Sequence, residues 1–239
     1  MKIFADYHTH TIYSDGKGTI EENVKAAIAK NLEIIGISDH GYKHMGFGVK
    51  HHLFEKMRYE VDLLSEKYPQ IKIMLGVECN ILDDRGNIDI DDKILKYFDY
   101  LMAGYHFGSA PTKWVRGIRN HFNNYVRVFN KFEKDYNTRA LVNAMKNNDI
   151  FILTHPGDKG EVDIMEVAEA SIETNTLLEI NAHHKNLTID QLLKIKTLDV
   201  QYVLGSDSHT PENVGNFDLA IQRALEAEID FSRIYNARR

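Results

Sequence analysis

The sequence predicts a single α/β domain in which parallel strands form a sheet or a barrel covered by helices. Short apolar runs, many of them β-branched, alternate with segments of helical spacing along the 239 residues. Most of these runs lack strict polar alternation, which is typical of strands covered on both faces. A chain of this length can fold as one α/β barrel. We therefore expect residues 1–239 to form one domain.

Seven runs are expected to be strands, at residues 3–7, 34–38, 71–77, 100–105, 150–154, 177–181 and 201–205. Helices are expected at residues 19–31, 53–67, 123–148 in one or two pieces, 164–174, 189–197 and 211–227. The first begins with a capping box, in which Thr19 and Glu22 satisfy free amides of the first turn. Residues 107–122 are expected to be the longest irregular connection, and long loops in compact domains are often functional.

The composition excludes several classes of protein. With 43% hydrophobic and 27% charged residues, the chain is neither disordered nor a collagen-like repeat. Lys and Arg number 29 against 35 Asp and Glu, a formal charge of −6, so nucleic-acid binding is not expected. The single cysteine, Cys79, cannot form an internal disulfide. No signal peptide or membrane span is visible at the N-terminus, and we expect a cytoplasmic location without membrane binding.

Histidine placement is the strongest functional signal, because six of the 12 histidines directly follow proposed strands. They are His8, His10, His40, His106, His155 and His209. Three acids accompany them, namely Asp15, Glu78 and Asp207. The C-terminal ends of parallel barrel strands converge on one rim, so these distant residues are expected to become neighbours. Imidazole and carboxylate together suit zinc, manganese or iron.

Two spacings strengthen the metal hypothesis. His8 and His10 are alternate residues of an extended segment, so both imidazoles can face one ion. Asp207 and His209 repeat this spacing at the other end of the chain, and the seam of a closed barrel would bring the two pairs together. His183 and His184 follow the sixth strand and are left out of the metal set. No glycine-rich fingerprint of a dinucleotide or P-loop site is present, so nucleotide cofactors are not implied.

The strand-end residues belong to short motifs that span positions 6 to 210. The motifs are Asp6-Tyr-His-Thr-His10 with Ser14-Asp-Gly16, Ile37-Ser-Asp-His40-Gly, Gly76-Val-Glu78, Ala103-Gly-Tyr-His106, Thr154-His155-Pro-Gly, Leu178-Glu-Ile-Asn181 and Gly205-Ser-Asp-Ser-His209-Thr. This series resembles the PHP (polymerase and histidinol phosphatase) family, and most closely its small stand-alone bacterial phosphatases. The resemblance implies a distorted seven-stranded (β/α)7 TIM-like barrel, the PHP fold, with a trinuclear metal centre on its rim.

The resemblance also implies a ligand set for three divalent ions, zinc being expected first, with manganese or iron as alternatives. The first ion would be bound by His8, His10, Glu78 and Asp207. Glu78 would bridge to a second ion, also held by His106 and His155. The third would be bound by Asp15, His40 and His209. Asp15 departs from those phosphatases of the family that carry histidine near this position.

The implied function is a metal-dependent phosphatase that hydrolyses a small-molecule phosphomonoester. A hydroxide bridging two ions would attack phosphorus, and the third ion would neutralise charge in the transition state. Glu78, Asp207 and His209 are taken as the catalytic residues. The expected partner is a small phosphorylated metabolite, and assembly into a homo-oligomer stays open.

Other functions are weighed against this one. A phosphodiesterase or exonuclease of the PHP family is the main alternative, although the net charge argues against it. An amidohydrolase acting on amides or esters also begins with a His-x-His pair, but its pattern needs a bridging lysine where this chain has Glu78. A metal-holding interaction domain without turnover would be expected to have lost ligands.

Arg116 and Arg119 are predicted to bind the substrate phosphate. They are the only arginines in residues 107–122, which leave the rim directly after His106. A guanidinium can hold two phosphate oxygens at once. In the alternative interpretation, both are solvated surface charges or pair with nearby acids.

Overall fold

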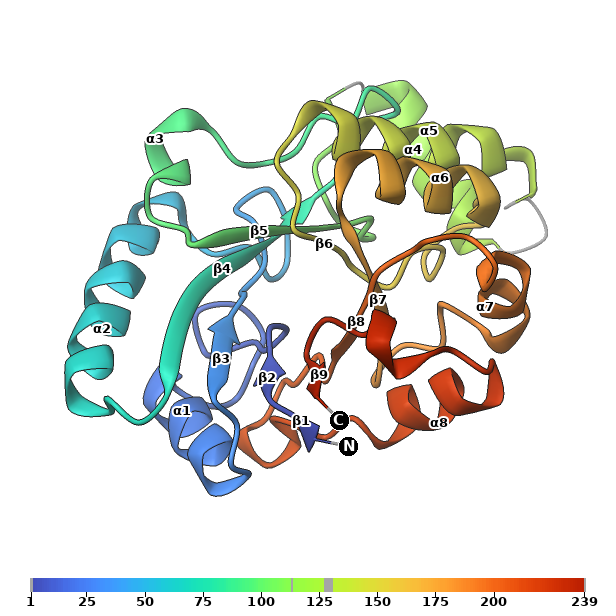
Figure 1. The fold of residues 1–239 in the computed structure, drawn as a ribbon. Helices are drawn as coiled ribbons and strands as arrows, with labels where there is room; N and C mark the ends of the chain where they lie inside the picture. Colours follow the sequence, from blue (N-terminus) through green and yellow to red (C-terminus); the bar gives the residue numbers. More distant parts are fainter. Residues whose placement is uncertain (1, 113, 127–130, 239) are drawn as a thin grey trace.

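The computed structural model describes residues 2–112, 114–126 and 131–238. Its main sheet contains seven parallel strands whose spatial order follows their order in the chain. They are β2 (Ala5–Asp6), β3 (Ile34–Ile37), β4 (Lys72–Asn80), β5 (Tyr100–Gly104), β6 (Ile152–Leu153), β7 (Leu177–Asn181) and β8 (Tyr202–Gly205). The sheet curls so that β8 comes back beside β2 (Figure 1). This confirms the predicted α/β barrel and its seven strands.

Two sets of contacts join β8 to β2 across the seam. At the rim, Thr9 and Ser208 form a parallel bridge, and the amide of His10 donates to the Ser208 carbonyl at 2.7 Å. At the opposite end, the Asn236 side-chain amide donates to the carbonyls of Ala5 and Leu204 at 2.7 and 2.8 Å. A small antiparallel pair, β1 (Lys2–Ile3) and β9 (Ala237–Arg238), brings both termini together below the barrel (Figure 1). The motifs at the two ends of the chain therefore meet.

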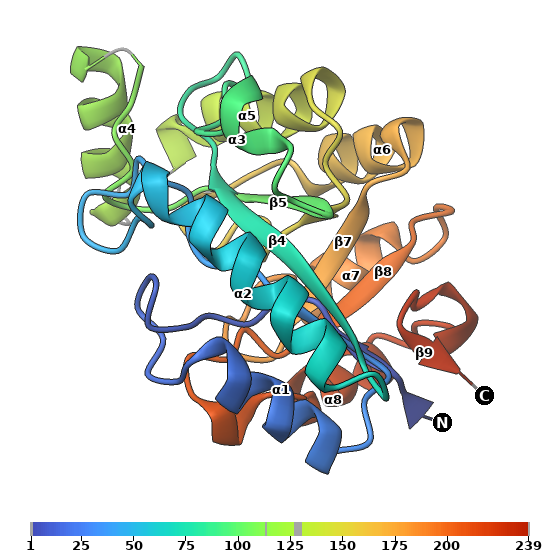
Figure 2. The same cartoon turned by 90° about the vertical axis from the view of Figure 1, so that its left-hand side faces the viewer.

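Helices cover the outside of the barrel. They are α1 (Ile20–Ala29), α2 (Phe54–Lys67), α3 (Asp92–Leu95), α4 (Trp114–Tyr125), α5 (Lys134–Asn147), α6 (Ile164–Thr174), α7 (Ile189–Ile195) and α8 (Asp218–Glu226), with 3₁₀ turns η1 (His51–Leu53), η3 (Pro211–Asn213) and η4 (Phe231–Arg233). Figure 2 shows α2 lying along β4. The capping box of α1 is present as predicted, with the Thr19 side chain accepting from the Glu22 amide. No helix among the described residues has the length and apolar character needed to span a bilayer.

Two sequence predictions about helices were wrong. The expected irregular stretch at 107–122 contains most of α4, which starts at Trp114. Its apolar residues recur at helical spacing, and the structure places them on the solvent side: Val115, Ile118, Phe122 and Tyr125 are all exposed. The expected helix at 211–227 is instead the turn η3 followed by α8. Of the expected helical range 123–148, residues 127–130 lie outside the described part of the chain.

The barrel interior changes from apolar to polar along its axis. Alternate strand residues point inward, and at the lower end they form a small cluster that includes Ala5, Tyr7, Tyr100, Met102, Ile152, Leu177 and Val203. On the same inner face, β4 and β7 carry the buried acids Glu78 and Glu179, which pair in register with Met102 and Val203 of this cluster. This apolar cluster therefore closes the lower end of the barrel beneath the polar rim.

Candidate metal centre

All nine metal ligands proposed from the sequence converge on the rim at the C-terminal ends of the strands. Seven of them are buried, each no more than 7% exposed: His8, His10, His40, Glu78, His106, His155 and Asp207. Asp15 and His209 are partly exposed at the mouth, with 19% and 31% of their side chains accessible. The structure thus places the nine residues within one cluster, as the strand-end reasoning expected.

Glu78 lies at the centre of this cluster, and its two carboxylate oxygens face different histidines. Oε1 is 3.1 Å from Nε2 of both His106 and His155. Oε2 is 3.0 Å from Nδ1 of His40 and 3.6 Å from Nε2 of His8. A carboxylate shared in this way between two sets of imidazoles has the geometry of a bridging ligand.

A second group of facing ligand atoms comes from the first motif, with His8 and His10, and from the last motif, with Asp207. Asp207 Oδ1 lies 3.3 Å from Nε2 of His10 and 3.5 Å from Nε2 of His8. Nearer the mouth, Asp15 Oδ2 is 3.5 Å from Nε2 of both His40 and His209. His10, Asp15, His40 and His209 have ligand atoms that all lie within 4.8 Å of one another, which is close enough to share one cation. Aspartate at position 15 therefore offers a carboxylate oxygen where a metal ligand was expected.

Several buried side chains orient these imidazoles, and sequence reasoning did not assign them. Glu179 Oε1 lies 2.6 Å from Nδ1 of His8, and its other oxygen accepts from the His155 amide at 3.0 Å. Asn80 Oδ1 lies 3.0 Å from Nδ1 of His106. Such contacts fix the ring and direct Nε2 toward the cluster. The available signal was strand alternation, which places the acid at position 179 on the inner face of an otherwise apolar strand.

Two of the proposed ligands have an unusual backbone conformation. His155 and Asp207 have φ values of 28° and 51°, in a region that residues other than glycine rarely adopt. Each lies two residues after the end of its strand, β6 for His155 and β8 for Asp207. Strain of this kind persists where the surrounding structure over-determines it, and it concentrates at functional sites.

The cluster holds its carboxylates ionised. Burial by itself would raise the pKa of Glu78, yet His106 and His8 keep that pKa well below its usual range. Burial also disfavours the charged form of His106, and it lowers the pKa of this imidazole to about 4. His40 behaves in the opposite way, because Asp15 and Glu78 outweigh burial and raise its pKa to about 10. Without cations, the protonated imidazoles of His8 and His40 therefore balance the buried acids, and bound cations would displace these protons.

The donor set fits divalent metal ions. Six imidazoles and three carboxylates face one another, and the buried Nδ1 of His10 has no hydrogen-bond partner among the described residues. Nitrogen and oxygen donors of this kind suit zinc, manganese or iron. The single cysteine, Cys79, is buried on β4 outside these groups, which argues against a closed structural zinc site.

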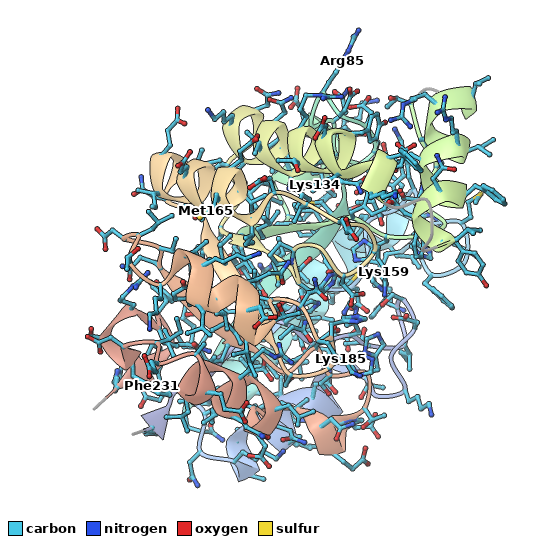
Figure 3. The ribbon with its side chains drawn as sticks, turned by 90° about the vertical axis from the view of Figure 1, so that its right-hand side faces the viewer. Arg85, Lys134, Lys159, Met165, Lys185 and Phe231 are labelled. Atoms are coloured by element: carbon cyan, nitrogen blue, oxygen red, sulfur yellow. The ribbon has the colours of Figure 1, made fainter. Side chains whose placement is uncertain are left out.

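A cavity of about 590 Å³ opens beside the cluster, between the loops that follow β6 and β7 and the end of α4. Its wall includes Tyr125, Asp158, Lys159, His184, Lys185 and Asn186. Lys159 and Lys185 lie on the same face of the molecule (Figure 3). A volume of this size suits a small metabolite, and its largely polar wall offers hydrogen bonds.

Arg116 lies on α4 and forms a structural ion pair. Its Nη2 is 2.6 Å from Oε2 of Glu133, which is 1% exposed, and its guanidinium lies 4.0 Å from the ring centroid of Tyr136. These contacts dock α4 against the start of α5. Arg119, one turn further along α4, is exposed. Neither arginine lines the cavity beside the cluster, so substrate binding by these two residues stays a prediction.

Alanine substitutions distinguish a structural role of these arginines from a role in substrate binding. We expect Arg116→Ala to lower the free energy of unfolding by about 1–3 kcal/mol, because buried Glu133 loses its cation. Arg119→Ala should leave the melting temperature unchanged. If an arginine holds the phosphate, its variant should lose at least about tenfold in kcat/KM, roughly 1.4 kcal/mol, at unchanged metal content. Wild-type kinetics in both variants would overturn the substrate-binding prediction.

Comparison with known proteins decides the family. Residues 6–183 match the family model of the PHP domain. The chain belongs to the PHP family. A probable phosphatase of Caldanaerobacter subterraneus subsp. tengcongensis is 34% identical over 95% of this chain and 84% of its own length. A DNA polymerase/3'-5' exonuclease of Bacillus subtilis is 28% identical over 99% of this chain, but over only 40% of its own length.

The fold of this PHP protein is also found in a solved structure. Histidinol phosphate phosphatase from Lactococcus lactis, in complex with zinc, L-histidinol and phosphate, aligns over 95% of both chains with a TM-score of 0.64 and 17% identity. Because the two chains are only 17% identical, this likeness is evidence for the fold alone. It agrees with the seven-stranded barrel described above and with the PHP fold that the motifs implied.

Proposed function

We propose that this PHP protein is a metal-dependent phosphatase that hydrolyses a small-molecule phosphomonoester at a three-metal centre. The observation that carries the proposal is the position of Glu78, whose two oxygens face separate groups of histidines. Likeness to the probable phosphatases supports the same class of reaction. Zinc is the first candidate metal, since the Lactococcus phosphatase was solved with zinc, and manganese and iron remain alternatives.

The residues divide naturally among three ions. His8, His10, Glu78 and Asp207 would hold the first, Glu78 with His106 and His155 the second, and Asp15, His40 and His209 the third. Divalent ions bound here would lower the pKa of water and neutralise the charge of a phosphoryl group in its transition state. The protein's own contribution is orientation, since Glu179 and Asn80 fix the rings of His8 and His106.

The leaving group would occupy the cavity beside the cluster. Its wall offers a side-chain amide from Asn186, cations from Lys159 and Lys185, and the aromatic ring of Tyr125. A polar organic group of metabolite size would fill this space, while the dianionic phosphate would face the metal ions of the cluster. Asp207, which is buried in the cluster, and His209, at its mouth, would contact the phosphate through the ions they hold.

A phosphodiesterase or exonuclease is the second candidate function. One observation favours it, namely the 28% identity with the Bacillus DNA polymerase/3'-5' exonuclease over nearly the whole chain. The formal charge of −6 argues against binding of a polyanionic strand.

Relative rates on two esters separate these candidates. We expect the metal-loaded protein to cleave 4-nitrophenyl phosphate with a kcat/KM at least about tenfold higher than bis(4-nitrophenyl) phosphate, because several cations favour a dianion over a monoanion. Both substrates release the same chromophore, so the comparison is direct. Faster cleavage of the diester, or of single-stranded DNA, would reassign the protein as a diesterase or nuclease.

A further inference from the structure

His184, which follows β7, lies between the metal cluster and the cavity. Its Nε2 is 3.5 Å from Oδ2 of Asp207, and its ring centroid is 4.6 Å from that of His155. Ligand atoms of His155, His184 and Asp207 all lie within 4.8 Å of one another. This spacing matches that of the other groups in the cluster, although His184 stands outside the nine ligands implied by the family motifs.

Asp158 contacts Nδ1 of His184, the ring nitrogen other than the one that faces Asp207. Its Oδ2 lies 3.2 Å from Nδ1 of His184 and 2.6 Å from the ammonium of Lys159. Nδ1 of His184 therefore carries the proton that this carboxylate accepts, and Nε2 is directed toward Asp207 and His155.

The same arrangement recurs at ligands already assigned. Nδ1 of His8 meets Glu179, Nδ1 of His106 meets Asn80, and Nδ1 of His209 meets the carbonyl of Asp207 at 3.0 Å. In each case Nε2 faces a carboxylate of the cluster. An oxygen acceptor behind Nδ1 is the usual support of a metal-binding histidine. His184 shares this support with three of the proposed ligands.

Neighbouring histidines that lack this support provide a contrast. His44 stacks on His40, but its Nδ1 accepts the backbone amides of Gly46 and Phe47 and so does not donate to an oxygen. His183 is adjacent to His184, and both amides bond to the side-chain oxygen of Asn181, yet none of the ion pairs described for this region involves His183. His183 is therefore the matched control for His184.

We propose that His184 is a tenth protein ligand of the metal centre, which joins His155 and Asp207 on the side of the cavity, and that Asp158 is its positioning residue. The inference rests on the proposed function only in requiring a metal centre on this rim. It deepens that function, because it adds a ligand from the loop after β7 where the substrate would enter. An ion held there would border both the cluster and the cavity.

Zinc affinity of the metal-free protein tests the proposal. Competition with a chromogenic chelator should show that His184→Ala weakens the binding of one zinc equivalent by at least about tenfold. His183→Ala should retain wild-type affinity for every equivalent. Asp158→Asn, which keeps the shape but loses the charge, should weaken the same equivalent by a smaller factor. The side chain of His184 is 23% exposed, so alanine at this position should be tolerated by the fold.

Further readouts separate this inference from the phosphatase assignment. In cobalt-loaded protein, His184→Ala should change the visible absorption bands, which report the ligands of the ion, whereas His183→Ala should not. Wild-type zinc affinities and cobalt spectrum in His184→Ala would overturn the tenth ligand and leave Asp158 and His184 as a plain ion pair. A wild-type protein that binds zinc tightly and releases no phosphate would instead overturn the proposed function, with the ligand assignment unaffected.

Discussion

Glu78→Gln is expected to reduce phosphatase activity by on the order of a thousandfold. Glutamine has nearly the same shape and keeps one oxygen, but it has no charge with which to hold two ions. Because the two oxygens of Glu78 face separate sets of histidines, the substitution should disturb two ions at once. Elemental analysis of the purified variant should show that more than one equivalent is lost relative to wild type.

Asp15→Asn is the matched control for this substitution, since it makes the same chemical change at the mouth of the site. Asp15 faces the single group of His10, His40 and His209, so at most one equivalent should be lost and the drop in activity should be smaller. Circular dichroism of both variants should confirm that each is folded. Equal retention of activity in the two variants would contradict the bridging role of Glu78.

Removal of metal is expected to lower the melting temperature strongly. Glu78, Asp207 and Glu179 are all buried within the cluster, and three divalent ions would add six positive charges to a formal net charge of −6. Each ion present at a hundred times its Kd stabilises the fold by about 2.7 kcal/mol. In a chain of this length that corresponds to a rise in Tm of roughly 5–10 °C per ion.

Differential scanning calorimetry with and without chelator measures this effect, followed by zinc added back in steps. The Tm should fall with chelator and recover as zinc is restored. His52→Ala, which removes an exposed histidine outside the cluster, should show the same metal dependence as wild type. A Tm that does not change with chelator or zinc would show that the cluster binds no metal in the folded state.

The barrel could be predicted from sequence because its strands follow a simple rule. Runs such as 177–181 are short and apolar, and polar residues appear where each run ends. Once strand ends are known, the geometry of a parallel barrel brings His8, Glu78 and Asp207 together without further information. The structure agrees, and Nε2 of His8 lies 3.6 Å from Glu78 and 3.5 Å from Asp207 at the rim.

The features that the sequence did not reveal depend on which way side chains face and on contacts between residues far apart in the chain. Helix α4 lies where a loop was expected, and its apolar residues Val115 and Phe122 are exposed, so they add nothing to the core. Glu179 and Asp158 orient His8 and His184 from other strands and loops, and nothing in local sequence links an acid at 158 to a histidine 26 positions later. Arg116 pairs with Glu133, a contact that required knowing how α4 packs on α5.

Titration of the metal-free protein with zinc, with phosphate release from 4-nitrophenyl phosphate measured at each step, tests the central claim most directly. The proposal of a three-metal phosphatase predicts that activity is absent without metal, rises with added zinc and reaches its plateau at three equivalents per chain. Full activity without metal, or a plateau already reached at one equivalent, would contradict it.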